Sequence, residues 1–238
     1  MKLTNDTWYY PILKPIYKFV RFNPIFSWIF TGIYGPIITK INLHKNQSKA
    51  ERKLDLGFDW RNPIDGFESL SIFQTPNADY VIDASKKMPF KDDSFNIIYA
   101  SHVLEHIPWY QVKTVLKEWV RILKPGGKLE VWVPDGYKIC SSLIDYEDKK
   151  IDHSYKDGYY ECVENKDPRL WANLRIYAHG DGKGDLQNDN WHRTLFTESL
   201  LKDMLRNSGL SNVELLSNNQ VRGRDHGWIN LGCTGIKS

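Results

Sequence analysis

Two continuous apolar segments separated by one amphipathic helix limit the folds open to this chain. SFNIIYAS (94–101) and KLEVWVPD (128–135) show no regular polar alternation, as expected of strands buried on both faces. Between them, apolar residues recur at helical spacing from Val112 to Leu123, and the PGG turn at 125–127 ends the helix. This order predicts a parallel βαβ unit, whose ligand crevice lies beyond the carboxyl ends of its strands.

Further strand candidates extend this unit in both directions, at 53–56, 66–73, 78–85, 212–217 and 227–236. A helix capped by Thr197 precedes the last two. We therefore predict an α/β fold: a Rossmann-like, mainly parallel, seven-stranded sheet with helices on both faces and an aromatic helical segment at the N-terminus. The residues that follow parallel strands gather at one edge, here Gly57, Asp83, Ser101 and Asp135.

Composition restricts the function. The 32 Lys and Arg against 29 Asp and Glu give a net charge of +3, too small to predict nucleic-acid binding. Three scattered cysteines without metal-ligand spacing indicate free thiols in a reducing, cytoplasmic compartment. The expected partner is a small-molecule or glycan acceptor rather than a nucleic acid.

The chain divides into an N-terminal segment, 1–52, and a main domain, 53–238, with an insert at about 136–190 that is rich in Tyr, Asp, Lys and Gly. The insert is expected to form a lid or a substrate loop. Residues 8–40 mix aromatic side chains with cations, but prolines and glycines interrupt the uncharged stretch 22–39. The segment either packs on the main domain, the favoured interpretation, or contacts the inner membrane surface.

Two segments carry a family resemblance, DASKKMPFKDDSFNIIYASHVLEHIPWYQVKTVLKEWVRILKPGGKLEVWVPD (83–135) and WHRTLFTESLLKDMLRNSGL (191–210). Their order resembles class I S-adenosylmethionine-dependent methyltransferases of the type 11-like group, similar to those of sugar and surface-polysaccharide pathways. The resemblance covers about 53–237. It implies S-adenosylmethionine as the cofactor and O-methylation of a sugar or glycan precursor. The implied cofactor-binding residues are Asp55, Gly57, Phe58, Asp59, Asp83, Ala84, Ser101 and His102.

The chain departs from this family at the cofactor loop. Where the family usually shows LNLGCG, residues 54–59 read LDLGFD, so Asp59 replaces the second glycine. The acid that usually ends the second strand is also missing, since Ser71 aligns there. Either Asp59 supplies the lost ribose acceptor and the enzyme is active, or the protein no longer methylates and binds a sugar, a nucleotide or a protein partner.

Methyl transfer to a hydroxyl calls for a base at the pocket mouth. His106 and His192 are the candidates, with helix buttressing and loop anchoring as their structural alternatives; Asp135 would orient the base or bind a sugar hydroxyl. His102 and His106 share a helix face if a helix begins at VLEHI. Tyr177 and Trp191 are candidate sugar-stacking side chains. We predict no metal site, because HVLEH is not HExxH and no third ligand stands out.

Overall fold

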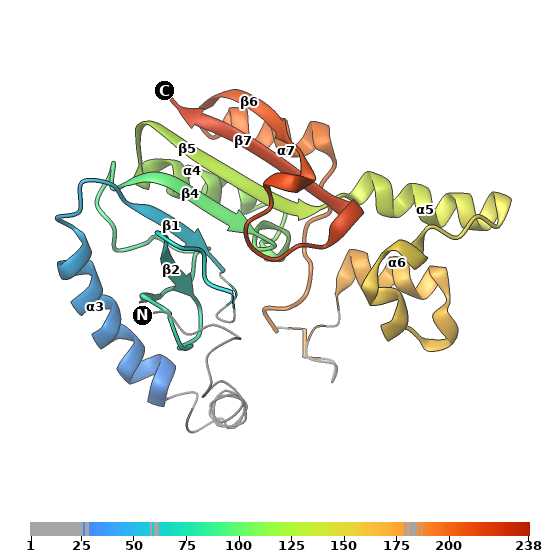
Figure 1. Ribbon diagram of the computed structural model, residues 1–238, viewed down its shortest axis with the longest axis horizontal. Coiled ribbons are helices and arrows are strands. Elements are labelled where there is room, and N and C mark those ends of the chain that lie inside the picture. Colours follow the sequence, from blue (N-terminus) through green and yellow to red (C-terminus); the bar gives the residue numbers. More distant parts are fainter. Residues whose placement is uncertain are drawn as a thin grey trace.

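The computed structural model describes residues 26, 29–57, 59, 62–178, 180, 185–186 and 188–238. Within them, one sheet has the strand order β3-β2-β1-β4-β5-β7-β6 (Figure 1). The strands are β1 (Lys53–Leu56), β2 (Glu68–Ser71), β3 (Tyr80–Val81), β4 (Phe95–Ser101), β5 (Leu123–Pro134), β6 (Leu210–Leu216) and β7 (Asn230–Lys237). Neighbouring strands among β1 to β5 are parallel, whereas β7 is antiparallel to both of its neighbours. The predicted α/β fold with a seven-stranded, mainly parallel sheet is confirmed.

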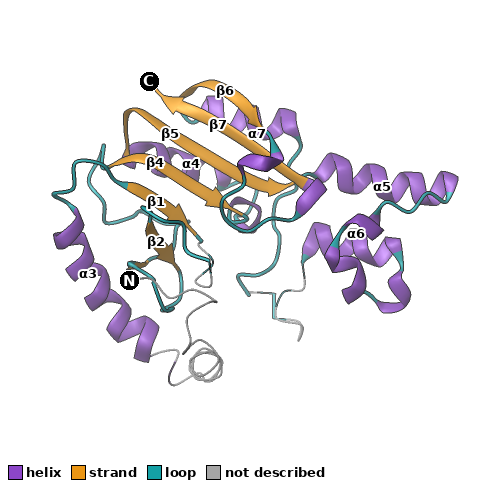
Figure 2. Cartoon of the chain, viewed as in Figure 1, coloured by secondary structure: helices purple, strands orange, loops and turns teal. Residues whose placement is uncertain are grey.

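The helical elements surround this sheet (Figure 2). The longer ones are α3 (Gly35–Asn46), α4 (Val112–Ile122), α5 (Gly136–Lys149), α6 (Pro168–Tyr177) and α7 (Glu198–Asn207), with a π-helix, η1, at Ile29–Tyr34. The short 3-10 helices are η2 (Leu104–His106), η3 (Ser154–Lys156), η4 (Gly158–Cys162), η5 (Glu164–Lys166), η6 (Asn218–Gln220) and η7 (Gly227–Ile229).

The main core lies between the sheet and the helices α4 and α7. The apolar stripe of α4 that the sequence predicted is buried at Val112, Val115, Leu116, Trp119 and Val120. These side chains form one cluster with strand residues of the same sheet face, including Leu54, Leu56, Ile98, Val131 and Val133. Burial of this continuous apolar face positions the carboxyl ends of β1, β4 and β5.

The opposite face is covered differently. Phe67, Tyr99 and Trp132 form a small cluster there. The hydroxyl oxygen of Tyr99 accepts hydrogen bonds from the main-chain nitrogens of Arg222, at 3.0 Å, and Gly223, at 2.9 Å. The connection between β6 and β7, which contains η6 and η7, therefore lies over β4 on this face. The described residues of 57–67 and 72–79, which join β1 to β2 and β2 to β3, contain no helix.

Residues 136–178 are more regular than their sequence indicated. The helices α5 and α6 lie side by side beyond the end of the sheet (Figure 1). Their shared cluster contains Ile139 and Trp171, and Trp171 stacks on Trp228 with ring centroids 6.1 Å apart. Nearby, the buried Arg175 guanidinium pairs with the Asp157 carboxylate. The long irregular stretch that we expected is thus partly helical, held by a cluster too small to give a clear periodic pattern.

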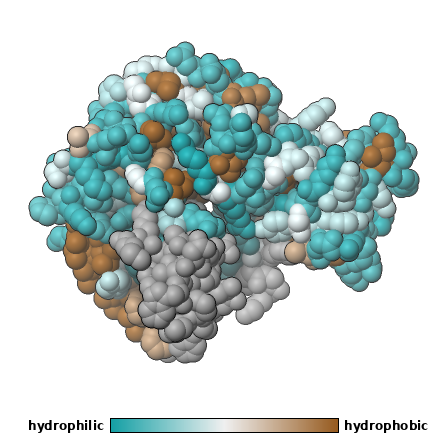
Figure 3. Space-filling model, viewed as in Figure 1, coloured by the Kyte–Doolittle hydropathy of each residue, from teal (hydrophilic) through white to brown (hydrophobic). Residues whose placement is uncertain are grey.

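Helix α3 is joined to the sheet edge by polar contacts. Asn46 Nδ2 donates to the Tyr80 hydroxyl at 2.9 Å, and the Val81 main-chain nitrogen donates to Thr39 Oγ1 at 2.8 Å. Apolar side chains remain exposed along η1 and α3, and Figure 3 shows hydrophobic residues gathered along this side of the molecule. They are Ile29, Phe30, Ile33, Tyr34, Ile37 and Ile41. No helix within the described residues combines the length and the apolar character needed to cross a membrane.

Candidate functional site

Gly57 forms the turn at the carboxyl end of β1. Its main-chain nitrogen donates to the Leu70 carbonyl oxygen at 3.0 Å, and its φ angle is +69°. A Cβ atom at this position would lie 2.3 Å from Cγ2 of Val103. Both the backbone conformation and the contact therefore require glycine, as expected where the chain must turn closely beneath a ligand.

Ser101 and His102 end the neighbouring strand, β4, and both have protein partners. Ser101 Oγ donates to the Arg224 carbonyl oxygen at 3.0 Å. His102 has a φ of +55° and is buried, with Nδ1 3.1 Å from Glu105 Oε1 and its ring 3.9 Å from that of His226. The two predicted cofactor residues thus also connect β4 to the turn that follows it and to the β6–β7 connection.

The remaining predicted cofactor residues lie along β1 and after β3. Asp55 is buried in β1, opposite Ser69 and Tyr99. The Asp59 carbonyl accepts from the Asn62 nitrogen at 3.0 Å, whereas Phe58 lies outside the described residues.

After β3, the exposed Asp83 accepts from the Ser85 main-chain nitrogen at 2.8 Å. The Ala84 carbonyl oxygen accepts from Trp119 Nε1 at 2.9 Å, which ties this turn to α4. Asp83 therefore makes a turn contact, and Ala84 is buried against the core.

Asp135 follows β5 and caps α5. Its Oδ1 accepts from the main-chain nitrogens of Tyr137, at 3.0 Å, and Lys138, at 3.2 Å. Lys138 Nζ lies 3.6 Å from its second carboxylate oxygen. Asp135 thus begins the helix after the sheet, while His192, which we expected it to orient, takes a different partner.

His192 is brought to the β4 turn by main-chain hydrogen bonds. The nitrogens of Arg193 and Thr194 donate to the Glu105 carbonyl oxygen at 2.7 and 3.1 Å, and Thr194 Oγ1 donates to the Ile107 carbonyl at 2.6 Å. His192 Nδ1 lies 3.0 Å from the Arg175 carbonyl oxygen. The segment before α7 is therefore fixed to the turn that carries Glu105.

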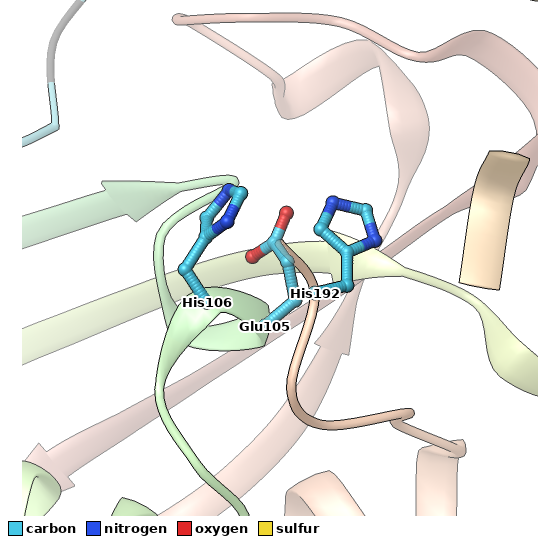
Figure 4. Close-up of side chains that lie close together, drawn as sticks. All are labelled: Glu105, His106 and His192. Atoms are coloured by element: carbon cyan, nitrogen blue, oxygen red, sulfur yellow. The ribbon is translucent and has the colours of Figure 1, made fainter. Parts of the chain in front are cut away.

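Glu105, His106 and His192 consequently face one another (Figure 4). The rings of His106 and His192 are 4.9 Å apart at 73°, and one donor atom from each of the three residues lies within 4.8 Å of the others. No third ligand stood out beside HVLEH because His192 lies far along the chain. The fold brings His192 next to Glu105 and His106.

The expectation that His102 and His106 share a helix face is wrong. VLEHI forms only the 3-10 turn η2, and α4 begins at Val112. The left-handed backbone at His102 prevents a helix from starting there, since non-glycine residues rarely continue from this conformation into a helix. The two imidazoles consequently have different partners.

Charge in this cluster is set by burial and by the histidines. Burial alone would raise the pKa of Glu105, but the hydrogen bond from His102 and the charges of His102, His106 and His192 lower it to about 2. Burial also lowers the pKa of His192 below its usual value of 6.5. At neutral pH the cluster therefore contains a carboxylate and a neutral His192 ring.

His226 and Asn230 were not predicted as site residues. Asn230 Oδ1 lies 3.3 Å from His102 Nε2 and accepts from the His226 main-chain nitrogen at 3.1 Å. His226 Nδ1 lies 2.6 Å from Nη1 of Arg175. Both residues come from the end of the chain, and no local motif marked them.

Comparisons with known proteins support the resemblance in the middle of the chain. A family model described as a methyltransferase domain matches residues 66–131, which include β2, β3, β4 and most of β5. The match begins after the Gly57 turn. It supports a class I methyltransferase relationship, with S-adenosylmethionine as the cofactor, for this part of the sheet.

Two curated proteins are similar to parts of the chain. Sterol 4-C-methyltransferase strm-1 of Caenorhabditis elegans is 47% identical over 47 residues, covering 20% of this chain and 14% of that protein. The uncharacterized protein YafE of Escherichia coli K12 is 27% identical over 128 residues, covering 51% of this chain and 58% of YafE. The chain thus spans less than two thirds of the length of either relative.

Solved structures show likeness over more of the chain. A structure from Thermotoga maritima, described as a SAM-dependent methyltransferase, is 18% identical and has a TM-score of 0.46. The similarity covers 92% of this chain and 98% of that one.

Proposed function

We propose that this protein transfers a methyl group from S-adenosylmethionine to a hydroxyl oxygen of a sugar or glycan precursor. The observation that carries the proposal is the Gly57 turn at the carboxyl end of β1, next to the end of β4, in a chain whose 66–131 segment matches a methyltransferase domain. Ligands of open α/β sheets bind at this edge. Gly57 fits close approach of a cofactor, and Asp59, two residues further on, would supply an acceptor for hydroxyl groups.

When bound, S-adenosylmethionine supplies a methyl group on a positively charged sulfur. The acceptor oxygen forms the new bond to the methyl carbon, the carbon–sulfur bond breaks, and its electron pair stays on the sulfur. The hydroxyl proton passes to a base. His192 suits this role because burial favours its neutral form, and the Arg175 carbonyl at Nδ1 leaves the lone pair on Nε2.

A groove beside His192 supports a sugar acceptor. Tyr177 and Trp191, the two candidate stacking side chains, both line it, together with Leu170, Asn173 and Glu164. The His192 main-chain nitrogen donates to the Tyr177 carbonyl at 3.0 Å, which links the groove to the proposed base. Sugars bind through aromatic faces and polar hydrogen-bonding groups, and this lining offers both. We assign 136–190 to an insert of the 53–238 domain that covers the acceptor.

A second candidate is a protein that has kept the fold and lost methylation. The observation that favours it is the β1–β2 connection, whose described residues contain no helix. Ser71, rather than an acid, ends β2, and its Oγ accepts from the Phe73 nitrogen at 3.2 Å. Such a protein would bind a sugar, a nucleotide or a protein partner at the same groove.

Two measurements separate the candidates. We expect calorimetry of the full chain to show binding of S-adenosylmethionine and S-adenosylhomocysteine. We also expect the labelled methyl group to be transferred to glycan acceptors but not to nucleic acids. Absence of cofactor binding by a folded sample at about millimolar cofactor would support the second candidate, and transfer only to a non-sugar acceptor would overturn the glycan assignment.

We also propose a cytoplasmic protein with peripheral membrane contact through residues 8–40. The exposed side chains of Ile33 and Ile37 on η1 and α3 support this contact, since apolar side chains beside cations favour an anionic bilayer surface. We expect the protein to co-sediment with anionic vesicles at low salt and expect Ile33→Asp with Ile37→Asp to reduce this binding. Equal sedimentation of the variant would contradict it.

A further inference from the structure

We propose that Glu105, His106 and His192 form a binding site for one divalent transition-metal ion, with Zn²⁺ the ion that this donor set suits best. The proposal starts from their proximity, since one donor atom of each lies within 4.8 Å of the others. Two ligands of one tetrahedral zinc ion, each about 2.1 Å from it, lie about 3.4 Å apart. The widest pair therefore has to close by up to about 1.4 Å.

A second observation comes from the Glu105 carboxylate itself. The residue is 1% exposed, and its Oε2 atom has no hydrogen-bond partner among the residues that the structure describes. The other oxygen, Oε1, accepts from His102 Nδ1. A buried carboxylate oxygen left without a partner is costly, and a cation would satisfy it.

The two imidazoles are oriented as metal ligands are. Nδ1 of His106 lies 3.3 Å from the Trp191 carbonyl oxygen, and Nδ1 of His192 lies 3.0 Å from the Arg175 carbonyl oxygen. A carbonyl oxygen only accepts, so these contacts place the ring proton on Nδ1 and the lone pair on Nε2 in both rings. Main-chain carbonyls commonly fix metal-binding histidines in this way.

The donor set selects the class of metal. Two imidazole nitrogens and one carboxylate oxygen are typical of zinc and other transition-metal sites with an open position, whereas Mg²⁺ and Ca²⁺ prefer oxygen ligands. Trp191, whose carbonyl orients His106, also lines the groove described above. A bound ion would take up the Nε2 lone pair of His192, so this ring holds either the ion or, in the proposed methyl transfer, the hydroxyl proton.

The test uses the untagged full chain, stripped with a chelator and titrated with zinc chloride in the absence of cofactor and acceptor. We expect one ion per chain by calorimetry and elemental analysis, and expect His106→Ala and His192→Ala each to weaken binding at least tenfold. The Co²⁺-loaded protein should show a visible absorption spectrum that both variants lose. His44→Ala, at an exposed histidine on α3, is the matched control and should bind as the native protein does.

Glu105→Gln tests the carboxylate as a ligand. Thermal unfolding with and without zinc shows whether each variant folds. Zinc should raise the melting temperature of the native protein and of His44→Ala only. No saturable zinc binding, or equal binding by His106→Ala, His192→Ala and His44→Ala, would overturn the proposal. Because the measurement involves no methyl transfer, failure of the proposed function would leave the metal result unchanged.

Discussion

Gly57 and Val103 are packed so closely that a methyl group on Gly57 would overlap the Val103 side chain, at 2.3 Å from Cγ2. This contact joins the turn after β1 to the turn after β4, the two connections at the edge where a cofactor is proposed to bind. The position of one turn therefore depends on the other.

We expect Gly57→Ala to destabilise the protein and to weaken cofactor binding at least tenfold. The left-handed backbone alone costs about 1–2 kcal/mol for a non-glycine residue, and the contact with Val103 adds to it. Gly66→Ala is the matched control, because Gly66 also has a positive φ, of +77°, but a Cβ there meets nothing within 4 Å. Urea unfolding and calorimetry measure both effects, and equal losses in the two variants would show that the Val103 contact is unimportant.

Asp59 is expected to contact the ribose or the amino acid end of the bound cofactor. One charge-assisted hydrogen bond is worth roughly 1.5–3 kcal/mol, so Asp59→Ala should weaken binding about tenfold or more. Asp65→Ala changes an exposed acid of the same connection and should bind the cofactor normally. Unchanged affinity of Asp59→Ala for the cofactor would mean that Asp59 does not take the place of the acid that is missing at Ser71.

The cap geometry of Asp135 predicts a mainly structural effect of substitution. Asp135→Ala removes the acceptor for Tyr137 and Lys138 and should cost about 1 kcal/mol of unfolding free energy. Asp135→Asn keeps an acceptor oxygen and should retain both stability and methyl transfer. A large loss of transfer in a fully stable Asp135→Asn protein would instead assign the carboxylate a part in the reaction.

Stability should fall as the pH drops below about 6.5. Burial lowers the pKa of His226, and the charges of His102, Arg175 and Arg224 lower it further; burial likewise lowers that of His192. Both rings therefore take up a proton in the unfolded chain before they do so in the folded protein. The stability that they contribute is complete above pH 6.5 and is lost as the pH falls towards their folded pKa values.

Each such histidine adds up to about 1.4 kcal/mol per pH unit to this slope. His226→Gln should therefore flatten the dependence of unfolding free energy on pH between about 5 and 6.5, whereas His44→Gln should not. Identical slopes for all three proteins would contradict the assignment. Below about pH 4.5 a further loss is expected, because the lowered pKa of Glu105 makes its protonation favour the unfolded chain.

Local patterns predicted the parts of the fold that depend on local burial. The apolar run of β4, the stripe of α4 and the Thr197 cap of α7 are all found as expected, because each is dictated by neighbouring residues. The turn at VLEHI was not predictable in this way. Its shape depends on His102, whose left-handed backbone is accompanied by contacts to Trp132 and Asn230 from distant strands.

The candidate site was predictable as a list of residues but not as an arrangement. His106 and His192 were both identified as candidate bases, yet spacing alone does not show that they meet, or that Glu105 lies between carbonyl-anchored rings. Asp135 was placed correctly at the end of β5. Its role as the N-cap of α5 was not predicted, because the sequence of α5 shows no periodic apolar pattern. Contacts across the fold determined both outcomes.

The antiparallel strand β7 also has a consequence for how the chain is made. It lies between β5 and β6, so among the described residues β6 pairs in the sheet with β7 alone. During synthesis, β6 leaves the ribosome before β7 and cannot pair in the sheet until β7 follows. Until then the edge of β5 is open to pairing with other chains. Asn230, the partner of His102, arrives with the same strand. The contact between His102 and Asn230 therefore forms only after β7 has been made, and a nascent chain that stalls before residue 230 exposes an unpaired strand and lacks this contact.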